Sequence, residues 1–258
     1  MKEQDRLLAE TAVKAGEIML VSGAEIGRVE DTIHHILRSA GQDGQAIVFS
    51  TGIFVNFKSG SGEELSLMRR VADRETNLNR ICQVNEVSRE LCRGAIEPGE
   101  ALGRLGEIRV KNQYSPRAKR FSYMWVAFFF GIVMGGGLWE CIGASLTGGA
   151  LGLLVYGAGR KGFNPFCVNG IGAFGAGLAA LAVQRFLLPQ ADSSIVIISS
   201  IMPLVPGMIF TTAVRDTLNG DYASGAARML EALVTALAVA AGVGAGMALF
   251  GWLTGGRL

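Results

Sequence analysis

The residues best able to do chemistry in this chain lie within a long apolar run toward its C-terminal end. The stretch MPLVPGMIFTTAVRDTLNGD at residues 202–221 holds two prolines and a glycine, then an adjacent arginine and aspartate. Proline lacks a backbone N–H and its ring clashes with the carbonyl four residues back, so we expect a helix to break or kink around residues 203–207. A half-helix restarting near Gly207 would direct free N–H groups and a positive dipole at an anion such as a carboxylate.

Two interpretations of this break stay open. It is either a proline kink packed against neighbouring helices, or a discontinuous helix at a transport site, where freed backbone groups line protein or a water-filled cavity. In the second interpretation Arg215 and Asp216 form a gate pair, or Arg215 attracts an anionic substrate. The candidate substrate-binding or gating residues are Pro203, Pro206, Gly207, Thr211, Thr212, Arg215, Asp216 and, in another apolar segment, Asn169.

Coupling of transport to an ion gradient would need ionisable groups near the path that the substrate takes. Acidic residues are sparse in the apolar part, and Glu140, Asp216 and Glu231 are the obvious proton carriers. Residues 219–221 form a turn signal, and a chain folding back there would bring Arg228 toward the break. The nucleotide-binding pattern GxxxxGK[ST] is absent, which argues against an ATP-driven pump and favours a proton or sodium gradient. The candidate coupling residues are Glu140, Asp221, Arg228 and Glu231.

Composition divides the chain near residue 120. Residues 1–120 hold 35 of the 46 Asp, Glu, Lys and Arg residues, whereas the rest of the chain holds 11 of them and 24 of the 36 glycines. We therefore expect a small cytoplasmic α+β domain over residues 1–111, a basic juxtamembrane linker over 112–120, and an all-α polytopic membrane domain over 121–258. The net charge of +2 gives no indication of a nucleic-acid partner.

Five uncharged runs in the apolar part are long enough to cross a bilayer, which takes about 20 apolar residues for about 30 Å of hydrocarbon. Glycine pairs at 131/135, 148/152 and 242/246 have the GxxxG spacing that lets membrane helices pack closely. The sequence therefore predicts five transmembrane helices. These spans are Phe121–Trp139, Cys141–Gly159, Gly162–Gln184, Ser193–Val214 and Ala232–Gly256.

Basic residues at the span ends predict the orientation of the chain in the membrane. One side would carry only Arg185 and Arg257. This bias places the N-terminal domain in the cytoplasm and the C-terminus outside. Because five is odd, a partner docked after the C-terminus would be inverted. The basic residues of the predicted inner side are Lys111, Arg117, Lys119, Arg120, Arg160, Lys161, Arg215 and Arg228.

Local patterns in the charged part predict helices, a small sheet, and helices again. Apolar residues in Ile26–Ala40 repeat on one helical face. Residues 45–58 predict two short strands or one bent strand, and Leu65–Val71 predicts another. Helical spacing returns in Asn77–Arg93 and Pro98–Val110.

We find no catalytic or metal-binding constellation here, and no enzyme activity, cofactor or metal is expected. His34 and His35 are adjacent and would point about 100° apart on a helix, so they cannot bind one ion together. Glu30 is spaced to pair with His34, which favours surface support over acid–base chemistry. Arg69 and Arg70 could bind an anion from a strand, although a solvated strand face is the favoured interpretation. The four cysteines are interpreted as reduced thiols.

Three stretches together resemble one known family: GAEIGRVEDTIHHIL at 23–37, the strand region at 45–58, and PLVPGMIFTTAVRDTLNGDYASGAARMLEA at 203–232. With the five spans, they are similar to the threonine/serine exporter family, and more closely to the larger subunit of its split two-subunit form, which is associated with succinate export. The resemblance implies a multi-pass protein of the bacterial inner membrane. It also implies export of threonine, serine or a succinate-like dicarboxylate by alternating access, with a smaller five-span partner of inverted topology.

A rival interpretation from another class is a membrane-anchored sensory or scaffold protein whose cytoplasmic domain carries the function. A deep pocket in that domain, with no polar cavity at mid-depth in the apolar part, would favour it. The exporter interpretation expects a polar path through the apolar part. Both interpretations allow a higher homo- or hetero-oligomer in the lipid bilayer.

Overall fold

The computed structural model describes residues 2–42, 44–58, 62, 64–72, 74–111 and 113–255, so Arg257 of the predicted orientation pattern lies outside the described residues. The chain divides into two compact units. Unit 1 consists of Met1–Lys111 with Gly207–Leu230, and unit 2 of Asn112–Pro206 with Glu231–Leu258. The N-terminal part of the chain therefore forms one unit with a segment that follows the proline-rich break.

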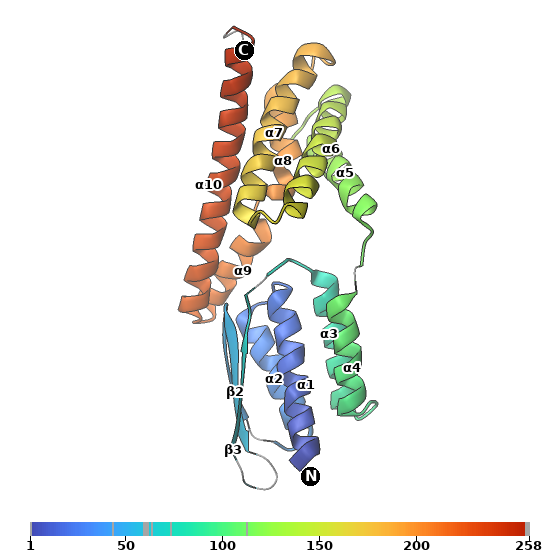
Figure 1. The fold of residues 1–258 in the computed structure, drawn as a ribbon, viewed down its shortest axis with the longest axis vertical. Coiled ribbons are helices and arrows are strands. Elements are labelled where there is room, and N and C mark those ends of the chain that lie inside the picture. The colour runs from blue at the N-terminus through green and yellow to red at the C-terminus, as the bar shows by residue number, and fades with distance from the viewer. Residues whose placement is uncertain are drawn as a thin grey trace. The chain divides into compact units, whose positions relative to one another are not determined.

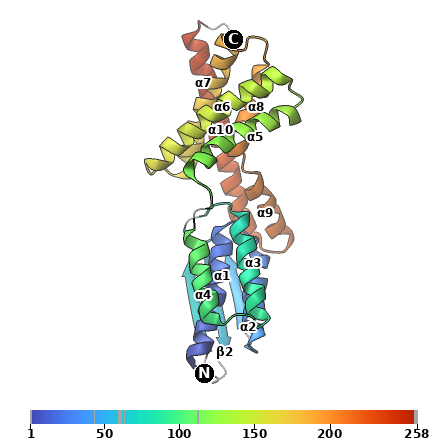
Figure 2. The same cartoon turned by 90° about the vertical axis from the view of Figure 1, so that its right-hand side faces the viewer.

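Unit 1 is layered around a single hydrophobic core (Figures 1 and 2). A small antiparallel sheet forms one layer, two helices contact the sheet, and two more helices pack on those. The sheet consists of β1 (Gly44–Phe49), β2 (Gly52–Lys58) and β3 (Glu64–Arg70). The helices are α1 (Lys2–Val21) and α2 (Ile26–Ser39) in the middle layer, then α3 (Leu78–Cys92) and α4 (Pro98–Val110).

Alternation along the strands decides which face of the sheet meets the helices. In β2, Ile53, Val55 and Phe57 are buried, whereas the residues between them are exposed. The strand order β1-β2-β3 pairs Val48 with Ile53 and places β1 at an edge. The predicted strand region at 45–58 is thus two strands joined by a tight turn, and the predicted helices of the charged part are confirmed as α2, α3 and α4.

The described residues of unit 2 form helices and the turns that connect them. Side-chain oxygens accept a hydrogen bond from a first-turn N–H at three helix starts, namely Ser115, Asn164 and Asp192, and a proline follows the first two as the opening helical residue. The helices are α5 (Pro116–Val133), α6 (Leu138–Arg160), α7 (Pro165–Phe186), α8 (Ser193–Ile201), the 3-10 turn η1 (Met202–Leu204), and most of α10 (Tyr222–Leu253).

Three helices among the described residues, α6, α7 and α10, are long and apolar enough to cross a membrane. There are up to four if α8–η1 and the following α9 (Gly207–Leu218) count as one broken span. The predicted first span differs most from the structure. Its helix, α5, ends at Val133, and Gly135 with φ +80° turns the chain before Trp139, which lies in α6. The three basic residues of α5 lie in its first turns, before residue 121, so its uncharged part covers only residues 121–133 and is shorter than the predicted span.

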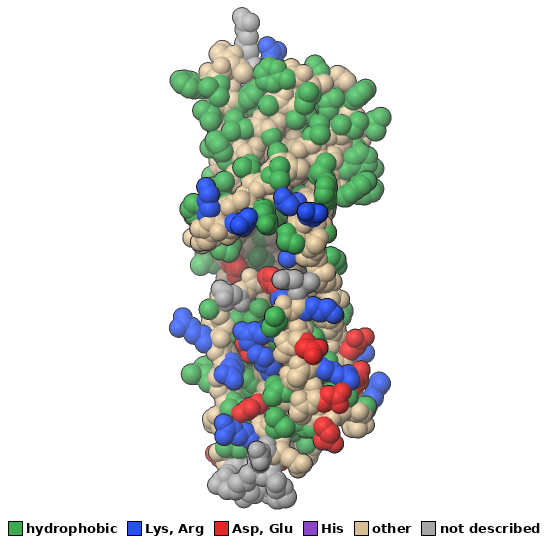
Figure 3. All heavy atoms as spheres, turned by 45° about the vertical axis from the view of Figure 1, so that its right-hand side comes forward, with side chains coloured by type: hydrophobic (Ala, Val, Ile, Leu, Met, Phe, Trp, Pro, Cys, Tyr) green, Lys and Arg blue, Asp and Glu red, His purple; other side chains and the backbone are tan. Residues whose placement is uncertain are grey.

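Glycines let the helices of unit 2 approach closely at two of the three predicted GxxxG pairs, 148/152 and 242/246, whereas Gly135 of the third pair lies in the turn after α5 with open space around it. A Cβ added at Gly148 would lie 2.6 Å from the Tyr123 carbonyl oxygen of α5. On α10, a Cβ at Gly242 or Gly246 would lie 2.5 Å or 2.4 Å from a carbonyl oxygen of α7. Exposed apolar side chains gather over unit 2, whereas charges gather over unit 1 (Figure 3). An apolar surface of this extent is typical of contact with lipid.

Candidate functional site

The predicted helix break is present. α8 ends at Ile201, η1 spans Met202–Leu204, and α9 begins at Gly207 directly after Pro206. Only Val205 and Pro206 lie between the two helical pieces, so the freed backbone is confined to one short step. Pro203 lies inside η1.

α9 and the start of α10 form a tight helical hairpin within unit 1. Gly220, with φ +96°, turns the chain, and the Asp221 N–H donates to the Asp216 carbonyl oxygen at 2.9 Å. Further along, a Cβ added at Gly225 would lie 3.0 Å from the Ala213 carbonyl oxygen, so the two helix backbones meet there. This close approach fixes which side chains of the two helices share a face.

Asp216 caps a helix that begins 190 positions earlier in the chain. The Ile26 N–H, at the first residue of α2, donates to Asp216 Oδ1 at 3.0 Å, and Asp216 is fully buried. Glu25 occupies the N-cap position of α2 but its side chain makes no cap hydrogen bond. A carboxylate at this position satisfies one of the free N–H groups of the helix start and faces the positive end of its dipole.

Arg228 completes the contact from the other arm of the hairpin. Its Nη1 lies 3.2 Å from Asp216 Oδ2, and its Nη2 donates to the Ala24 carbonyl oxygen at 2.8 Å. Both side chains are almost entirely inaccessible to solvent. Asp216 Oδ2 has the ion pair but no hydrogen bond of good geometry from any described residue. The pair therefore joins both arms of the hairpin to the turn between α1 and α2, and leaves one carboxylate oxygen incompletely satisfied.

Three side chains protect the free edge of the sheet. The N–H groups of Ala46 and Val48 in β1, and that of Ser50 in the turn after β1, each have a side-chain acceptor. His34 Nε2 accepts from Ala46 at 3.2 Å, Glu30 Oε1 from Val48 at 2.9 Å, and Ser224 Oγ from Ser50 at 3.1 Å. The edge strand is thus covered by α2 and by the hairpin. Glu30 and His34 thus have a structural role, but they fulfil it by accepting strand N–H groups and not through the pair with each other that the sequence favoured.

Arg215 makes a more accessible contact on the same hairpin. Its Nη1 donates to Glu25 Oε1, and the Arg215 side chain is 64% exposed. An exposed ion pair of this kind contributes about 0–1 kcal/mol, because water competes for both charges. Arg215 is therefore a cation beside the helix cap whose partner can be exchanged at low cost. We name the group formed by Glu25, Arg215, Asp216, Ser224 and Arg228 the hairpin latch.

Comparison with known proteins shows the family of the chain. A family model described as "Putative threonine/serine exporter" matches residues 10–250. The chain belongs to the threonine/serine exporter family. It is 24% identical over 249 residues to a "Probable threonine/serine exporter" of Mycobacterium tuberculosis, covering 92% of this chain and 45% of the relative. It is also 24% identical to the "Threonine/serine exporter" of Corynebacterium glutamicum, covering 92% of this chain and 50% of that protein.

The chain spans about half the length of these exporters. No solved structure matches it. The match runs through both units, so the hairpin latch and the apolar helices belong to one family region. Both relatives are named as exporters, which agrees with a membrane transporter and with the prediction that the chain is not an enzyme.

The structure brings together part of the predicted exporter site. Arg215, Asp216 and Arg228 meet in the hairpin latch, and Asp221 lies close enough to Glu30 for the two carboxylates to repel. Thr211 and Thr212 are on α9, but both hydroxyls donate to the Met208 carbonyl oxygen of their own helix, at 3.1 and 2.8 Å. Each hydroxyl therefore has its proton in use, and only its oxygen is free to accept a hydrogen bond.

The other predicted residues lie in unit 2 or at its boundary. Glu140, in the first turn of α6, accepts the Asp192 N–H at 3.0 Å and so fastens the start of α8. Asn169 is partly exposed on α7, and Glu231 is exposed on α10. Gly207 is exposed at the start of α9, where an added Cβ would meet nothing within 4 Å. A glycine is therefore not required at this position for close packing of neighbouring groups.

Reasoning from the sequence missed Glu25 as a member of the latch, and missed the Ile26 amide as the group that Asp216 caps. A backbone N–H leaves no mark in the sequence, and a glutamate before a helix is a common feature. One signal was available: Glu25 is a poor N-cap residue compared with Ser, Thr, Asp or Asn, which leaves the start of α2 in need of an acceptor from elsewhere.

Glu30 supplies a pH-dependent test of this part of the structure. Burial raises the pKa of the Glu30 carboxyl, the Val48 N–H opposes the rise, and the Asp221 carboxylate adds to it. A glutamate with a raised folded-state pKa contributes stability that is fully present below its unfolded pKa of about 4.3 and is lost as pH rises through the folded pKa. The melting temperature of the wild type, relative to Glu30→Gln, should therefore fall as pH rises above about 4, then level off. A difference that grows with pH would contradict the burial of this carboxyl.

Proposed function

We propose that the chain is a subunit of a secondary exporter of small organic acids or hydroxy amino acids, such as threonine, serine or a succinate-like dicarboxylate. The observation that carries the proposal is the interrupted segment from α8 to α9, which lies within the matched family region and leads directly into the hairpin latch. Interrupted helices that bring charged groups near a break are a common way to build a substrate site in secondary transporters.

The latch suggests how access could be controlled. Threonine, serine and succinate all carry a carboxylate, which can replace Glu25 on the exposed Arg215 guanidinium at little energetic cost. The buried Asp216–Arg228 pair holds the hairpin on the α1–α2 turn until Asp216 gains a proton, for which Oδ2 has capacity. In this mechanism Arg215 receives the substrate and Asp216 couples release of the latch to a proton gradient.

For the topology we propose five spans, with α5 as the first and α8–η1–α9 as the broken fourth, in a bacterial inner membrane with the N-terminus cytoplasmic. Two contacts support this orientation. Arg120 and Arg160 both lie over the Tyr156 ring, 4.8 and 5.9 Å from its centroid, so basic groups from α5 and α6 occupy the same end of unit 2. The charged N-terminal part also contacts residues 215–228, at the predicted inner end of the fourth span.

We further propose a smaller five-span partner of inverted topology that completes the transport path by alternating access. The test is efflux from cells that express this chain with such a partner, with threonine, serine and succinate each measured. Efflux should need both proteins and should collapse when the proton gradient is dissipated. Full efflux from this chain alone would contradict the two-subunit form, and efflux of none of the three compounds would contradict the substrate class.

Arg215→Ala should lower efflux by about tenfold or more without unfolding the protein, because a hydrogen bond to a charged group contributes about 1.5–3 kcal/mol whereas the exposed pair with Glu25 adds little stability. Glu25→Ala is the matched control, since it removes the same ion pair and keeps the cation. If Arg215 binds substrate, only Arg215→Ala should reduce efflux. Equal losses in both variants would show that the ion pair, not substrate binding, matters.

A further inference from the structure

A groove between α2 and α3 gathers positive charge away from the hairpin latch. It has a volume of about 620 Å³ and is lined by α2 residues from Arg28 to Ser39 and by α3 residues from Asn85 to Arg93. This volume falls within the range of sites that hold small molecules. We name it the α2–α3 groove.

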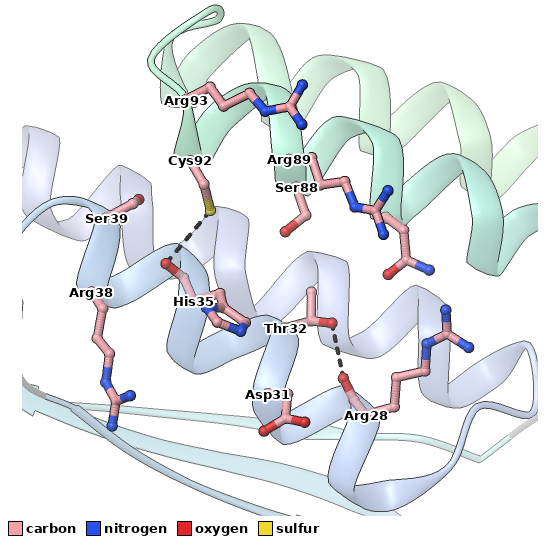
Figure 4. Close-up of a pocket in the computed structure, with 11 residues that line it drawn as sticks. Arg28, Asp31, Thr32, His35, Arg38, Ser39, Ser88, Arg89, Cys92 and Arg93 are labelled. Atoms are coloured by element: carbon pink, nitrogen blue, oxygen red, sulfur yellow. Dashed lines mark hydrogen bonds between the residues drawn. The ribbon is translucent and has the colours of Figure 1, made fainter.

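The lining of this groove is strongly unbalanced in charge. Four arginines contribute to it, whereas Asp31 is the one carboxylate among its lining residues. Figure 4 shows Arg28 and Arg89 extending from opposite walls toward one end, with Arg38 and Ser39 at the other. None of the four arginines forms an ion pair with a carboxylate in the part of the chain that the structure describes. Four unpaired guanidinium groups repel one another, which favours a bound counter-charge.

Neutral polar groups of the groove are also available to a ligand. Ser88 is 7% exposed, and within the described residues its hydroxyl has no hydrogen-bond partner. Asn85 lies one turn before it on α3, facing the same groove. By contrast, the Thr32 hydroxyl is already used, since it donates to the Arg28 carbonyl oxygen at 2.9 Å. Guanidinium forks flanked by a free hydroxyl and an amide are well suited to oxyanions.

We propose that the α2–α3 groove binds a small anion carrying at least two negative charges, of the phosphate or multiple-carboxylate type. The proposal goes beyond export and does not depend on which compound is transported. α2 carries the groove on the side away from the sheet and is capped at its start by Asp216. The same helix therefore contacts both the anion and the hairpin latch.

Isothermal titration calorimetry of the full chain tests the proposal. The chain is placed in nanodiscs of neutral phosphatidylcholine and titrated at constant ionic strength with sodium phosphate, sodium citrate and, as monovalent control, sodium chloride. Phosphate or citrate should give saturable heat at one site, and chloride none. Arg28→Gln with Arg89→Gln should weaken affinity by about a hundredfold, at roughly tenfold for each charge-assisted contact. Arg70→Gln, which removes an exposed charge from β3, should change nothing.

Nanodiscs of phosphatidic acid, whose phosphomonoester headgroup carries up to two negative charges, distinguish a free anion from a lipid headgroup. If headgroups reach the groove, added phosphate gives no heat in these discs but still binds in neutral ones. If the ligand is a free anion, the heat is the same in both. Either result supports an anion site. The proposal is overturned if no multivalent anion binds in neutral discs, or if the Arg28 and Arg89 variant binds as the wild type does.

Discussion

Arg228→Met is expected to lower the free energy of unfolding of unit 1 by about 3–5 kcal/mol, because it leaves the Asp216 carboxylate buried without its counter-charge. The substitution also removes the donor to the Ala24 carbonyl oxygen. A second change should restore much of the loss. Asp216→Asn in the same chain removes the buried charge and keeps an oxygen that can accept the Ile26 N–H.

The double variant, Asp216→Asn with Arg228→Met, should therefore be more stable than Arg228→Met alone. Circular dichroism during denaturation in detergent gives the stability. Tryptophan fluorescence does not report on unit 1, because the three tryptophans, at 125, 139 and 252, all belong to unit 2. Hydrogen exchange of a peptide covering residues 22–30 localises the effect, since the Ile26 amide loses its acceptor when the latch opens.

Arg215→Ala is the control for the latch, with an expected loss of at most about 1 kcal/mol because its ion pair is exposed. If the Arg228 variant and the double variant unfold at the same denaturant concentration, the buried charge is not what destabilises the protein. The cost would then come from lost packing around the arginine stem.

Local signals predicted the local structure well. The spacing of apolar residues predicted α2, and the alternation of apolar and polar residues predicted the strands, because both patterns depend on residues near one another in the chain. Two prolines were enough to locate the break before Gly207, since a proline acts on its own turn. The predicted end of the first span was less accurate, because the uncharged run continues through residues 134–137, where Gly135 turns the chain.

Long-range contacts were beyond the sequence. Charge bias put Arg215 and Asp216 at an inner membrane boundary, but nothing in their spacing indicates that Asp216 caps a helix 190 residues away. The α2–α3 groove could have been found in part. Arg28, Thr32, His35 and Ser39 recur at helical spacing on a face of α2 beside its apolar stripe, but the facing wall needs the packing of α3. The strand arginines Arg69 and Arg70 are exposed, in agreement with a solvated strand face.

Gly246→Ala should separate α10 from α7 and destabilise unit 2. The added Cβ would lie 2.4 Å from the Phe174 carbonyl oxygen, and the obstacle is backbone, which cannot rotate aside as a side chain could. Gly242→Ala should behave alike, at 2.5 Å from the Gly170 carbonyl oxygen. Overpacking typically costs about 1–3 kcal/mol, and backbone contact puts these two toward the upper end.

Gly244→Ala on the same helix is the matched control, because an added Cβ there meets nothing within 4 Å. Alanine favours helix over glycine by about 1 kcal/mol, so this variant should be as stable as the wild type or slightly more stable. Trp252, exposed near the end of α10, reports the transition by fluorescence in detergent. If Gly244→Ala raises the stability while Gly246→Ala lowers it, glycine on α10 serves close contact with α7. Equal effects would instead mean that α10 tolerates a methyl group on either face, and that the small-residue spacing of this helix does not hold unit 2 together.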